Sequence, residues 1–376
     1  MNASCVEGDT SRLGTVVARV GPARVLLFTG GASYEASGAA AAVEPILRDV
    51  AVERVSSVTP NPTLPEVESA IASFRAFGPD LVIAAGGGSV IDLAKAVRLL
   101  AAQESQPRDV VTGLAEALPA ETPLIAIPTT SGTGSEATHF AVVFFDDVKF
   151  SLAHETARPD FAILDPLLTY TLPASLTAIT GLDALSQAME SLWSMRSTPE
   201  SQSIARRSLR LSRGALTTAV HRPSPQSRAD MFEAAHLSGE AIDISMTTAS
   251  HALSYMLTTG HGVPHGHAVA LTLGAVLEFN AGVTTDDCLD PRGVRHVQGV
   301  VDEALELLGA PDPASGRRTI EALVASLGLV PTLEGVGAGS QGARLRIANS
   351  VDPQRLANNP RRFTPAQLVE LVDSIA

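Results

Sequence analysis

The feature that most constrains the fold is a change of pattern near residue 173. Before it, short apolar runs alternate with helical stretches, and after it helical patterns dominate. Candidate strands lie at 24–29, 52–58, 80–85 and 124–127, and candidate helices of the second part at roughly 174–195, 198–218, 228–258, 266–281, 297–308, 317–326 and 365–375. Strands that alternate with helices favour a parallel sheet. The sequence therefore predicts an α/β domain with a parallel sheet over residues 1–173 and an all-helical domain over 174–376, with a cleft between them.

Composition excludes several classes of partner. The formal net charge is −13 and no run of Lys or Arg forms a basic stripe, so we expect neither nucleic acid nor an anionic membrane as a partner. No apolar stretch reaches the roughly 20 residues that span a bilayer, and the first residues, MNASCVEGDTSRLG, lack the pattern of a secretory signal. Cys5 and Cys288 are the only cysteines. They could pair, but a reduced cytoplasmic protein is the favoured interpretation.

A glycine turn follows the third candidate strand. The run 80–85 continues into Gly86-Gly87-Gly88-Ser89 and then into a helical run at 90–100. The free N–H groups of a helix N-terminus bind phosphate, and glycines let the anion approach. We expect Ser89 to cap this helix and Asp92 to close a capping box. The turn is not G-x-G-x-x-G, and a purely structural tight turn remains the alternative.

A second polar loop, 128–136 (PTTSGTGSE), follows the next candidate strand. The loop is rich in glycines and hydroxyls, which is typical of a segment that wraps a polar ligand. The hydroxyls include those of Thr129, Thr130 and Thr133. A capped structural loop is the alternative. Two such loops at the ends of neighbouring parallel strands fit a ligand at the carboxyl edge of the sheet.

Four potential metal ligands lie in the second part. Asp183 and Gln187 are four residues apart on a candidate helix, so they share one face. His251 and His265 lie on either side of a Gly/Pro-rich break. Imidazole and carboxylate with an open position suit Fe²⁺ or Zn²⁺ acting as a Lewis acid. The alternatives are an Asp at a helix N-terminus beside an ordinary Gln, and histidines satisfied within the core.

Several long motifs together resemble the iron-containing (group III) alcohol dehydrogenase family over nearly the whole chain. They are GGGSVIDLAKA, PTTSGTGSEAT, DFAILDP, GLDALSQAMES, HALSYMLTTGHGVPHGHAVAL and LANNPRRFT, in the family's order and spacing. The resemblance implies a metal-dependent NAD(P) alcohol dehydrogenase or aldehyde reductase and a homodimer. It also implies an N-terminal domain that binds the dinucleotide and a helical domain that binds metal and substrate.

The resemblance also implies roles for individual residues. Cofactor positions matching the family's motifs are Gly87, Gly88, Ser89 and Asp92 near the pyrophosphate, Thr129, Thr130 and Thr133 along the nucleotide, and Lys149 at the ribose. Asp183, His251 and His265 match three metal ligands. The fourth ligand is usually His in the family and is Gln187 here, and a further family His is replaced by Tyr255, a candidate proton donor. Lys149 and Lys95 are the only lysines, which suggests selected positions.

The resemblance further implies a cofactor preference and a substrate. Family members that prefer NAD place an acid at the end of the first strand, where Gly30 stands here, so we expect NADPH to be accepted. The segments LDALSQAMESLWSMRST and TTASHALSYMLTTGHGVPHGHAVAL are similar to those of phosphonoacetaldehyde reductases, which make 2-hydroxyethylphosphonate in phosphonate biosynthesis. Candidates for the substrate anion are His139, His154, Arg158, Arg196, His261 and His267. The rival interpretations are a general short-chain alcohol or aldehyde dehydrogenase and a non-catalytic nucleotide-binding protein.

Overall fold

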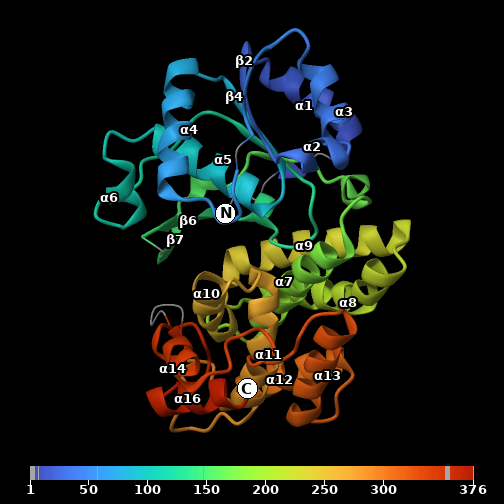
Figure 1. The fold of residues 1–376 in the computed structure, drawn as a ribbon, viewed down its shortest axis with the longest axis vertical. Coiled ribbons are helices and arrows are strands. Elements are labelled where there is room, and N and C mark those ends of the chain that lie inside the picture. The colour runs from blue at the N-terminus through green and yellow to red at the C-terminus, as the bar shows by residue number, and fades with distance from the viewer. Residues whose placement is uncertain (1–4, 7, 57, 147, 352–355, 376) are drawn as a thin grey trace. The chain divides into compact units, whose positions relative to one another are not determined.

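The computed structural model describes residues 5–6, 8–56, 58–146, 148–351 and 356–375 of the chain (Figure 1). The chain divides into two compact units, Met1–Leu172 and Pro173–Ala376. Part of the N-terminal segment considered above, including the side chain of Cys5, lies outside the described residues, and Cys288 is a half-buried free cysteine. Within the described residues, no helix has the length and apolarity needed to cross a membrane.

The first unit contains a parallel six-stranded sheet, which confirms the predicted fold class. Its order is β1-β8-β5-β4-β2-β3. The strands are β1 Cys5–Val6, β2 Arg24–Thr29, β3 Ala51–Val55, β4 Leu81–Gly86, β5 Leu124–Pro128 and β8 Phe161–Ala162. Every residue of β4 and β5 is buried, which explains their continuous apolar sequence. Gly86 pairs with Pro128 in register, so both polar loops leave the same edge of the sheet.

Helices cover both faces of this sheet. They are α1 Leu13–Val20, α2 Ala32–Ala36, α3 Ala39–Val43, α4 Leu64–Phe77, α5 Gly88–Ala101 and α6 Pro107–Val111, with short 3-10 turns at Thr10–Arg12, Glu44–Leu47, Ser135–Ala137, Glu155–Ala157 and Pro166–Thr169. Val25 and Leu27 of β2 pack with α1 and α3, whereas Leu26 and Phe28 pack with α4 and α5. Successive residues of the strand thus point into the apolar clusters on opposite faces of the sheet. The two groups of helices flank the sheet in Figure 1.

A hairpin that the sequence reading missed adds a second, antiparallel sheet to this unit. It consists of β6 Phe140–Phe145 and β7 Val148–Ala153. Ala141, Val143 and Leu152 join the apolar cluster of α4 and α5.

The described part of the second unit is built from helices, as predicted. They are α7 Ala174–Trp193, α8 Pro199–His221, α9 Pro225–Ser245, α10 Ala249–His261, α11 His265–Ala281, α12 Val294–Leu308, α13 Pro313–Ser326, α14 Gln341–Asn349 and α16 Pro365–Asp373. The single helix expected over 228–258 is wrong: it is two helices, α9 and α10. The helix breaks at Met246, whose φ of 60° is left-handed. Helix α14 was not predicted.

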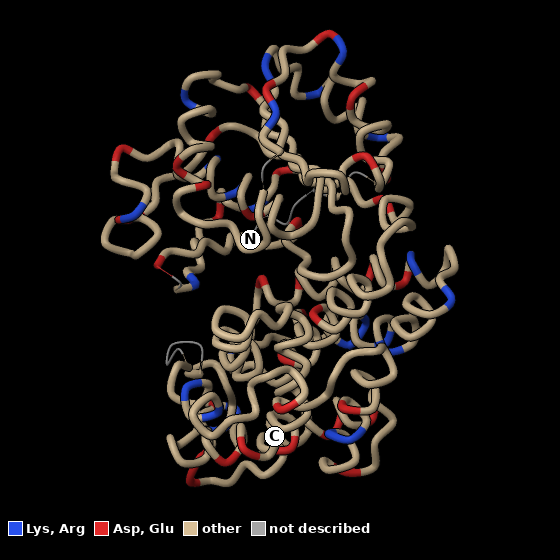
Figure 2. Tube along the Cα trace, in the orientation of Figure 1, with Lys and Arg blue, Asp and Glu red and all other residues tan. Residues whose placement is uncertain are grey.

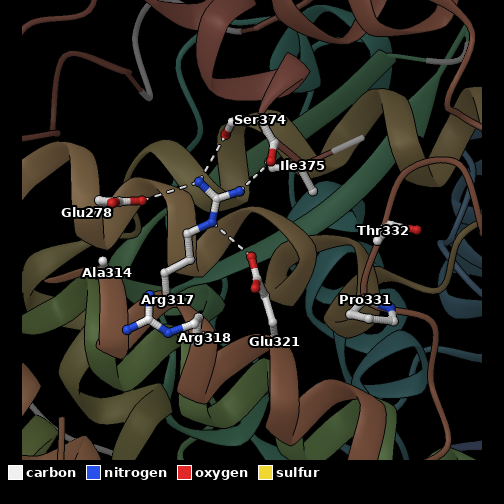
Figure 3. A pocket seen from close by; sticks show the side chains of 9 residues that line it. All are labelled: Glu278, Ala314, Arg317, Arg318, Glu321, Pro331, Thr332, Ser374 and Ile375. Atoms are coloured by element: carbon white, nitrogen blue, oxygen red, sulfur yellow. Dashed lines mark hydrogen bonds and ion pairs between the residues drawn. The ribbon is translucent and has the colours of Figure 1, made fainter.

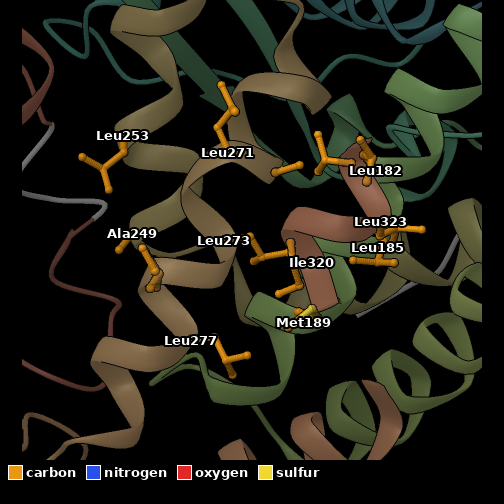
Figure 4. Packing of buried hydrophobic residues seen from close by; sticks show 14 of the residues in the cluster. Leu182, Leu185, Met189, Ala249, Leu253, Leu271, Leu273, Leu277, Ile320 and Leu323 are labelled. Atoms are coloured by element: carbon orange, nitrogen blue, oxygen red, sulfur yellow. The ribbon is translucent and has the colours of Figure 1, made fainter. Parts of the chain in front are cut away.

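Helix α7 runs through the interior of the second unit. Its stripe of Leu182, Leu185 and Met189 belongs to an apolar cluster that includes Leu271, Leu273 and Leu277 of α11 and Ile320 and Leu323 of α13 (Figure 4). This packing carries the polar residues on the other face of α7 into the interior. Acidic and basic residues occur in both units, as Figure 2 shows.

Candidate metal centre and nucleotide loops

The glycine turn after β4 differs in one detail from the expectation. Gly87, in an extended conformation, is the N-cap of α5, so Ser89 is not the cap and Asp92 closes no capping box. Helical bonding starts earlier than expected because the N–H groups of Val90 and Ile91 already donate to Gly87 O. Asp92 instead accepts hydrogen bonds from Ser135 Oγ and from the N–H of Val142 at 3.1 Å. It therefore fastens α5 to the second polar loop and to β6.

The two polar loops pack directly against each other. The N–H of Thr129 donates to Gly86 O at 2.9 Å. A Cβ added to Gly88 would lie 2.6 Å from Thr133 Oγ1, and one added to Gly87 would lie 3.2 Å from Thr130 Cγ2. The structure thus brings five of the predicted cofactor positions together at the carboxyl ends of β4 and β5. Glycine is required at 88 because a side chain there would push the loops apart.

The two lysines have different surroundings. Lys95 is fully buried in α5, and its Nζ donates to Ser135 O at 2.7 Å and to Thr138 Oγ1 at 2.8 Å. It anchors the end of the second polar loop, a role that sequence reasoning did not assign. Lys149 lies half-buried on β7, in register with Phe144 of β6. Its contact with the cofactor stays a prediction.

Asp183, His251 and His265 come together from α7, α10 and α11. Their potential ligand atoms all lie within 4.8 Å of one another. Asp183 Oδ1 is 3.4 Å from His251 Nε2 and 3.9 Å from His265 Nε2. Asp183 and His251 are buried, whereas the His265 side chain is 28% exposed. The cluster is therefore exposed to solvent at His265.

A buried carboxylate that sequence reasoning missed orients His251. Glu190 on α7 is fully buried and contacts His251 Nδ1 through Oε2. Its Oε1 accepts from Thr248 Oγ1 at 2.7 Å and from the N–H of Ser250 at 2.8 Å. Since a carboxylate accepts, Nδ1 carries a proton, so in the neutral imidazole Nε2 presents its lone pair to the cluster. The available signal was helical spacing, because Glu190 follows Asp183 by seven residues.

Opposing effects set the pKa of His251. Burial lowers this pKa, but the negative charge of Glu190 and the nearby Asp183 raise it more, so that it lies above the ordinary histidine value. Among the described residues, the buried Nε2 has no hydrogen-bond partner, and at 3.4 Å it is too far from Asp183 for a good one. A cation between these two atoms would give the neutral Nε2 a partner.

Gln187 reaches the cluster with its nitrogen. Its Nε2 donates to Asp183 Oδ2 at 3.3 Å, and its Oε1 accepts from Ser238 Oγ of α9 at 2.8 Å. The structure thus brings all four predicted metal positions together. In this orientation, however, the oxygen that could bind a cation faces Ser238.

Gly266 sets the approach of α11 to α7. A Cβ added there would lie 2.1 Å from Ile179 O and 3.0 Å from Asp183 Cβ. His265 is the first residue of α11, so this close contact fixes its distance from Asp183.

The candidate anion contacts are scattered. His267 Nε2 bonds to Val330 O at 2.7 Å, His154 caps the turn at Glu155–Ala157, and Arg158 pairs with Glu155 at 3.2 Å. Arg196 is exposed beyond the end of α7, and His261 is the half-buried last residue of α10. The remaining candidate, His139, makes an edge contact with the Phe140 ring. Tyr255 is half-buried, one turn after His251.

A pocket of about 400 Å³ elsewhere in the second unit has a different character (Figure 3). Its central cation, Arg317, is bonded to Glu321 at 2.8 Å, to Glu278 at 3.3 Å and to Ser374 Oγ at 3.1 Å. No predicted site residue lines it.

Comparisons with known proteins match this chain to alcohol dehydrogenases and aldehyde reductases. The profile described as "Iron-containing alcohol dehydrogenase" matches residues 3–166, and "Fe-containing alcohol dehydrogenase family, C-terminal" matches residues 177–376. A phosphonoacetaldehyde reductase of Streptomyces viridochromogenes is 38% identical over 83% of this chain and 80% of its own. A probable alcohol dehydrogenase EutG of Escherichia coli is 34% identical, over 82% and 76%. A solved sulfoacetaldehyde reductase from Bifidobacterium kashiwanohense, in complex with NAD+, is 28% identical with a TM-score of 0.85, over 99% and 96%.

Proposed function

Since the chain belongs to the iron-containing alcohol dehydrogenase family, we propose that it reduces phosphonoacetaldehyde to 2-hydroxyethylphosphonate with a nicotinamide cofactor and a divalent cation. The resemblance read from the sequence is confirmed, and the chain is an oxidoreductase that acts on alcohols and aldehydes. The observation that supports the narrower substrate is the 38% identity to a phosphonoacetaldehyde reductase.

The donor set fits a divalent cation. Asp183, His251 and His265 offer one carboxylate oxygen and two imidazole nitrogens within 4.8 Å of one another, and the lone pair of His251 Nε2 is held in place by Glu190. We propose Gln187 as the fourth ligand. Two nitrogens with two oxygens suit Fe²⁺, our first choice, or Zn²⁺.

The cation, the cofactor and the chain's own residues would have different roles in the reduction. A bound cation would supply Lewis-acid polarisation of the carbonyl oxygen, and a reduced nicotinamide would supply hydride to the carbonyl carbon. Asp183 offsets positive charge in the cluster, and Glu190 holds His251 in the tautomer that presents Nε2. Reduction also needs a proton at the product oxygen. Tyr255 Oη is the candidate donor, because Tyr255 shares a helix face with His251.

The dinucleotide would bind at the two packed loops. Gly87, Gly88 and Ser89 lie at the start of α5, where first-turn N–H groups favour a pyrophosphate. Thr129, Thr130 and Thr133 would line the nucleotide and Lys149 would contact the ribose, while Asp92 would act by holding the loops. Strand β2 ends at Thr29 and is followed by Gly30, without an acid to repel a 2′-phosphate. NADPH should therefore reach at least about a tenth of the kcat/KM obtained with NADH.

A phosphonate needs a cationic partner near the cluster. Arg196 lies beyond the end of α7, thirteen residues along the chain from Asp183, whereas His261 precedes His265 by only four residues. His261 ends α10 at the turn that leads to His265. We propose His261 as the phosphonate contact. His261→Ala should raise KM for phosphonoacetaldehyde and leave KM for propanal unchanged.

The substrate assignment is tested by comparing kcat/KM for phosphonoacetaldehyde and propanal with each cofactor. At least a tenfold preference for the phosphonate supports the proposal. Equal values would favour the general alcohol dehydrogenase, a function consistent with the similarity to EutG. Turnover of neither aldehyde by the metal-loaded chain would favour the non-catalytic nucleotide-binding protein.

A further inference from the structure

The hydroxyl of Ser238 has one proton and lies within hydrogen-bond distance of two acceptor oxygens. Ser238 is fully buried on α9, and its Oγ lies 2.8 Å from Gln187 Oε1 and 2.8 Å from Ala235 O. Because a hydroxyl has a single O–H, it cannot donate fully to both oxygens. In this orientation only one of the two oxygens receives the hydroxyl proton.

Turning the Gln187 amide by half a turn removes this competition for the hydroxyl proton. Nε2 would then donate to Ser238 Oγ, which would accept that bond and donate its proton to Ala235 O. Gln187 Oε1 would face Asp183, where Nε2 now lies 3.3 Å from Oδ2. Two oxygens repel each other there unless a cation lies between them, so a cation favours the turned amide.

We propose that Ser238 is a positioning residue that makes Gln187 an oxygen ligand, by accepting from the amide nitrogen when the amide oxygen turns to the cation. The inference rests on the proposed cation site and assigns to it a residue on a fourth helix, α9. A hydroxyl suits this position because it can donate to the amide in one orientation and accept from it in the other. Gln187 thereby keeps a buried partner in both states.

The test is the affinity of the purified chain, stripped of metal, for Zn²⁺, measured by competition with a chromophoric chelator. Ser238→Ala should weaken binding by about ten- to a hundredfold, the usual effect of losing a partner that orients a ligand. Ser208→Ala is the matched control. Ser208 is also fully buried, and its Oγ donates to Ala234 O at 2.7 Å from the neighbouring helix α8. It should bind Zn²⁺ as the unmodified chain does.

A double-mutant cycle with Gln187→Ala separates positioning from a general structural effect. Gln187→Ala should weaken binding by itself, and adding Ser238→Ala should then change affinity by less than about twofold. Ser238→Thr, which keeps the hydroxyl, should retain the affinity. If Ser238→Ala leaves the Zn²⁺ affinity unchanged, or lowers it equally with and without Gln187, the role of Ser238 is overturned but the cation site is not. Failure of the unmodified chain to bind Zn²⁺ or Fe²⁺ overturns the cation site and this inference together.

Discussion

At the scale of single residues, the chemistry of the cluster depends on the charge of Glu190. Glu190→Gln keeps the shape of the side chain but removes the negative charge that holds the His251 proton on Nδ1. We expect divalent metal affinity to fall by about ten- to a hundredfold, and kcat/KM to fall with it. Metal titration and steady-state kinetics measure both quantities.

The matched control for this change is Glu233→Gln. Glu233, on α9, pairs with Arg207, and its side chain is 41% exposed. Surface pairs contribute little, so both affinity and turnover should stay as they are. An unchanged affinity in Glu190→Gln would contradict the role given to Glu190.

Sequence patterns and motifs placed the four candidate ligands in one site, but they missed Glu190 and Ser238, the buried residues that contact two of them. The positions of Asp183 and Gln187 followed from spacing on one helix. Glu190 lies on the same helix but among apolar residues, so its burial against His251 could not be read from α7 alone. Ser238 meets Gln187 across 51 residues of chain. Contacts of this kind depend on how helices pack.

At the scale of elements, the cluster depends on how closely α11 approaches α7. Gly266→Ala places a methyl group 2.1 Å from Ile179 O, so one helix must shift. We expect a loss of about 1–3 kcal/mol in the free energy of unfolding, from overpacking, together with weaker metal binding because His265 moves. Denaturant unfolding and metal titration report the two effects.

Gly299→Ala serves as the control for this prediction. Gly299 lies on the exposed face of α12, with no atom within 4 Å of an added Cβ. Alanine there should stabilise the chain by roughly 0.5–1 kcal/mol, since glycine is a poor helix residue, and should leave metal binding alone. Equal behaviour of the two variants would contradict a specific contact between α7 and α11.

Element boundaries were predicted best where local patterns decide them. The continuous apolar runs predicted the strands β4 and β5 because both strands are buried along their whole length. The break between α9 and α10 depends on Met246 in a left-handed conformation and on Glu190, which accepts from the start of α10. Glu190 belongs to another helix, and no pattern within 228–258 contains that information.

At the scale of the whole molecule, an ion pair between the buried Asp290 and the partly exposed Arg292 connects distant parts of the second unit. Arg292 donates to Asp290 at 2.8 and 2.6 Å, to Ser197 O at 2.7 Å and to Ser194 O at 2.9 Å. It thereby fastens the turn between α7 and α8. Burial raises the pKa of Asp290, but the hydrogen bonds and charge of Arg292 outweigh it and leave the pKa below its ordinary value.

The contribution of Asp290 to stability depends on pH. Because the folded pKa of Asp290 lies below the unfolded one, its stabilisation is present above the unfolded pKa and is lost as pH falls through the folded pKa. Asp290→Asn should unfold more easily at pH 7, by about 1–3 kcal/mol. The difference from the unmodified chain should shrink towards pH 3. Unfolding curves that stay equally separated at all pH values would contradict this account.

Two properties of the whole molecule stay predictions. The homodimer follows from the family resemblance alone, and light scattering of the purified chain measures it. The assignment of dinucleotide binding to the first unit and of metal binding to the second is supported by where the packed loops and the cluster lie. Nucleotide and metal titrations of Gly88→Ala and His265→Ala test it, because each variant should lose one ligand and retain the other.

The most direct test of the central claim is aldehyde reduction by the chain after its metal has been removed and then restored. We expect NADPH oxidation with phosphonoacetaldehyde to disappear on chelation and to return on addition of one Fe²⁺ or Zn²⁺ per chain. In His265→Ala, neither metal should restore turnover, although the variant folds and binds nucleotide. Full turnover by the metal-stripped chain, or by His265→Ala, would contradict the account.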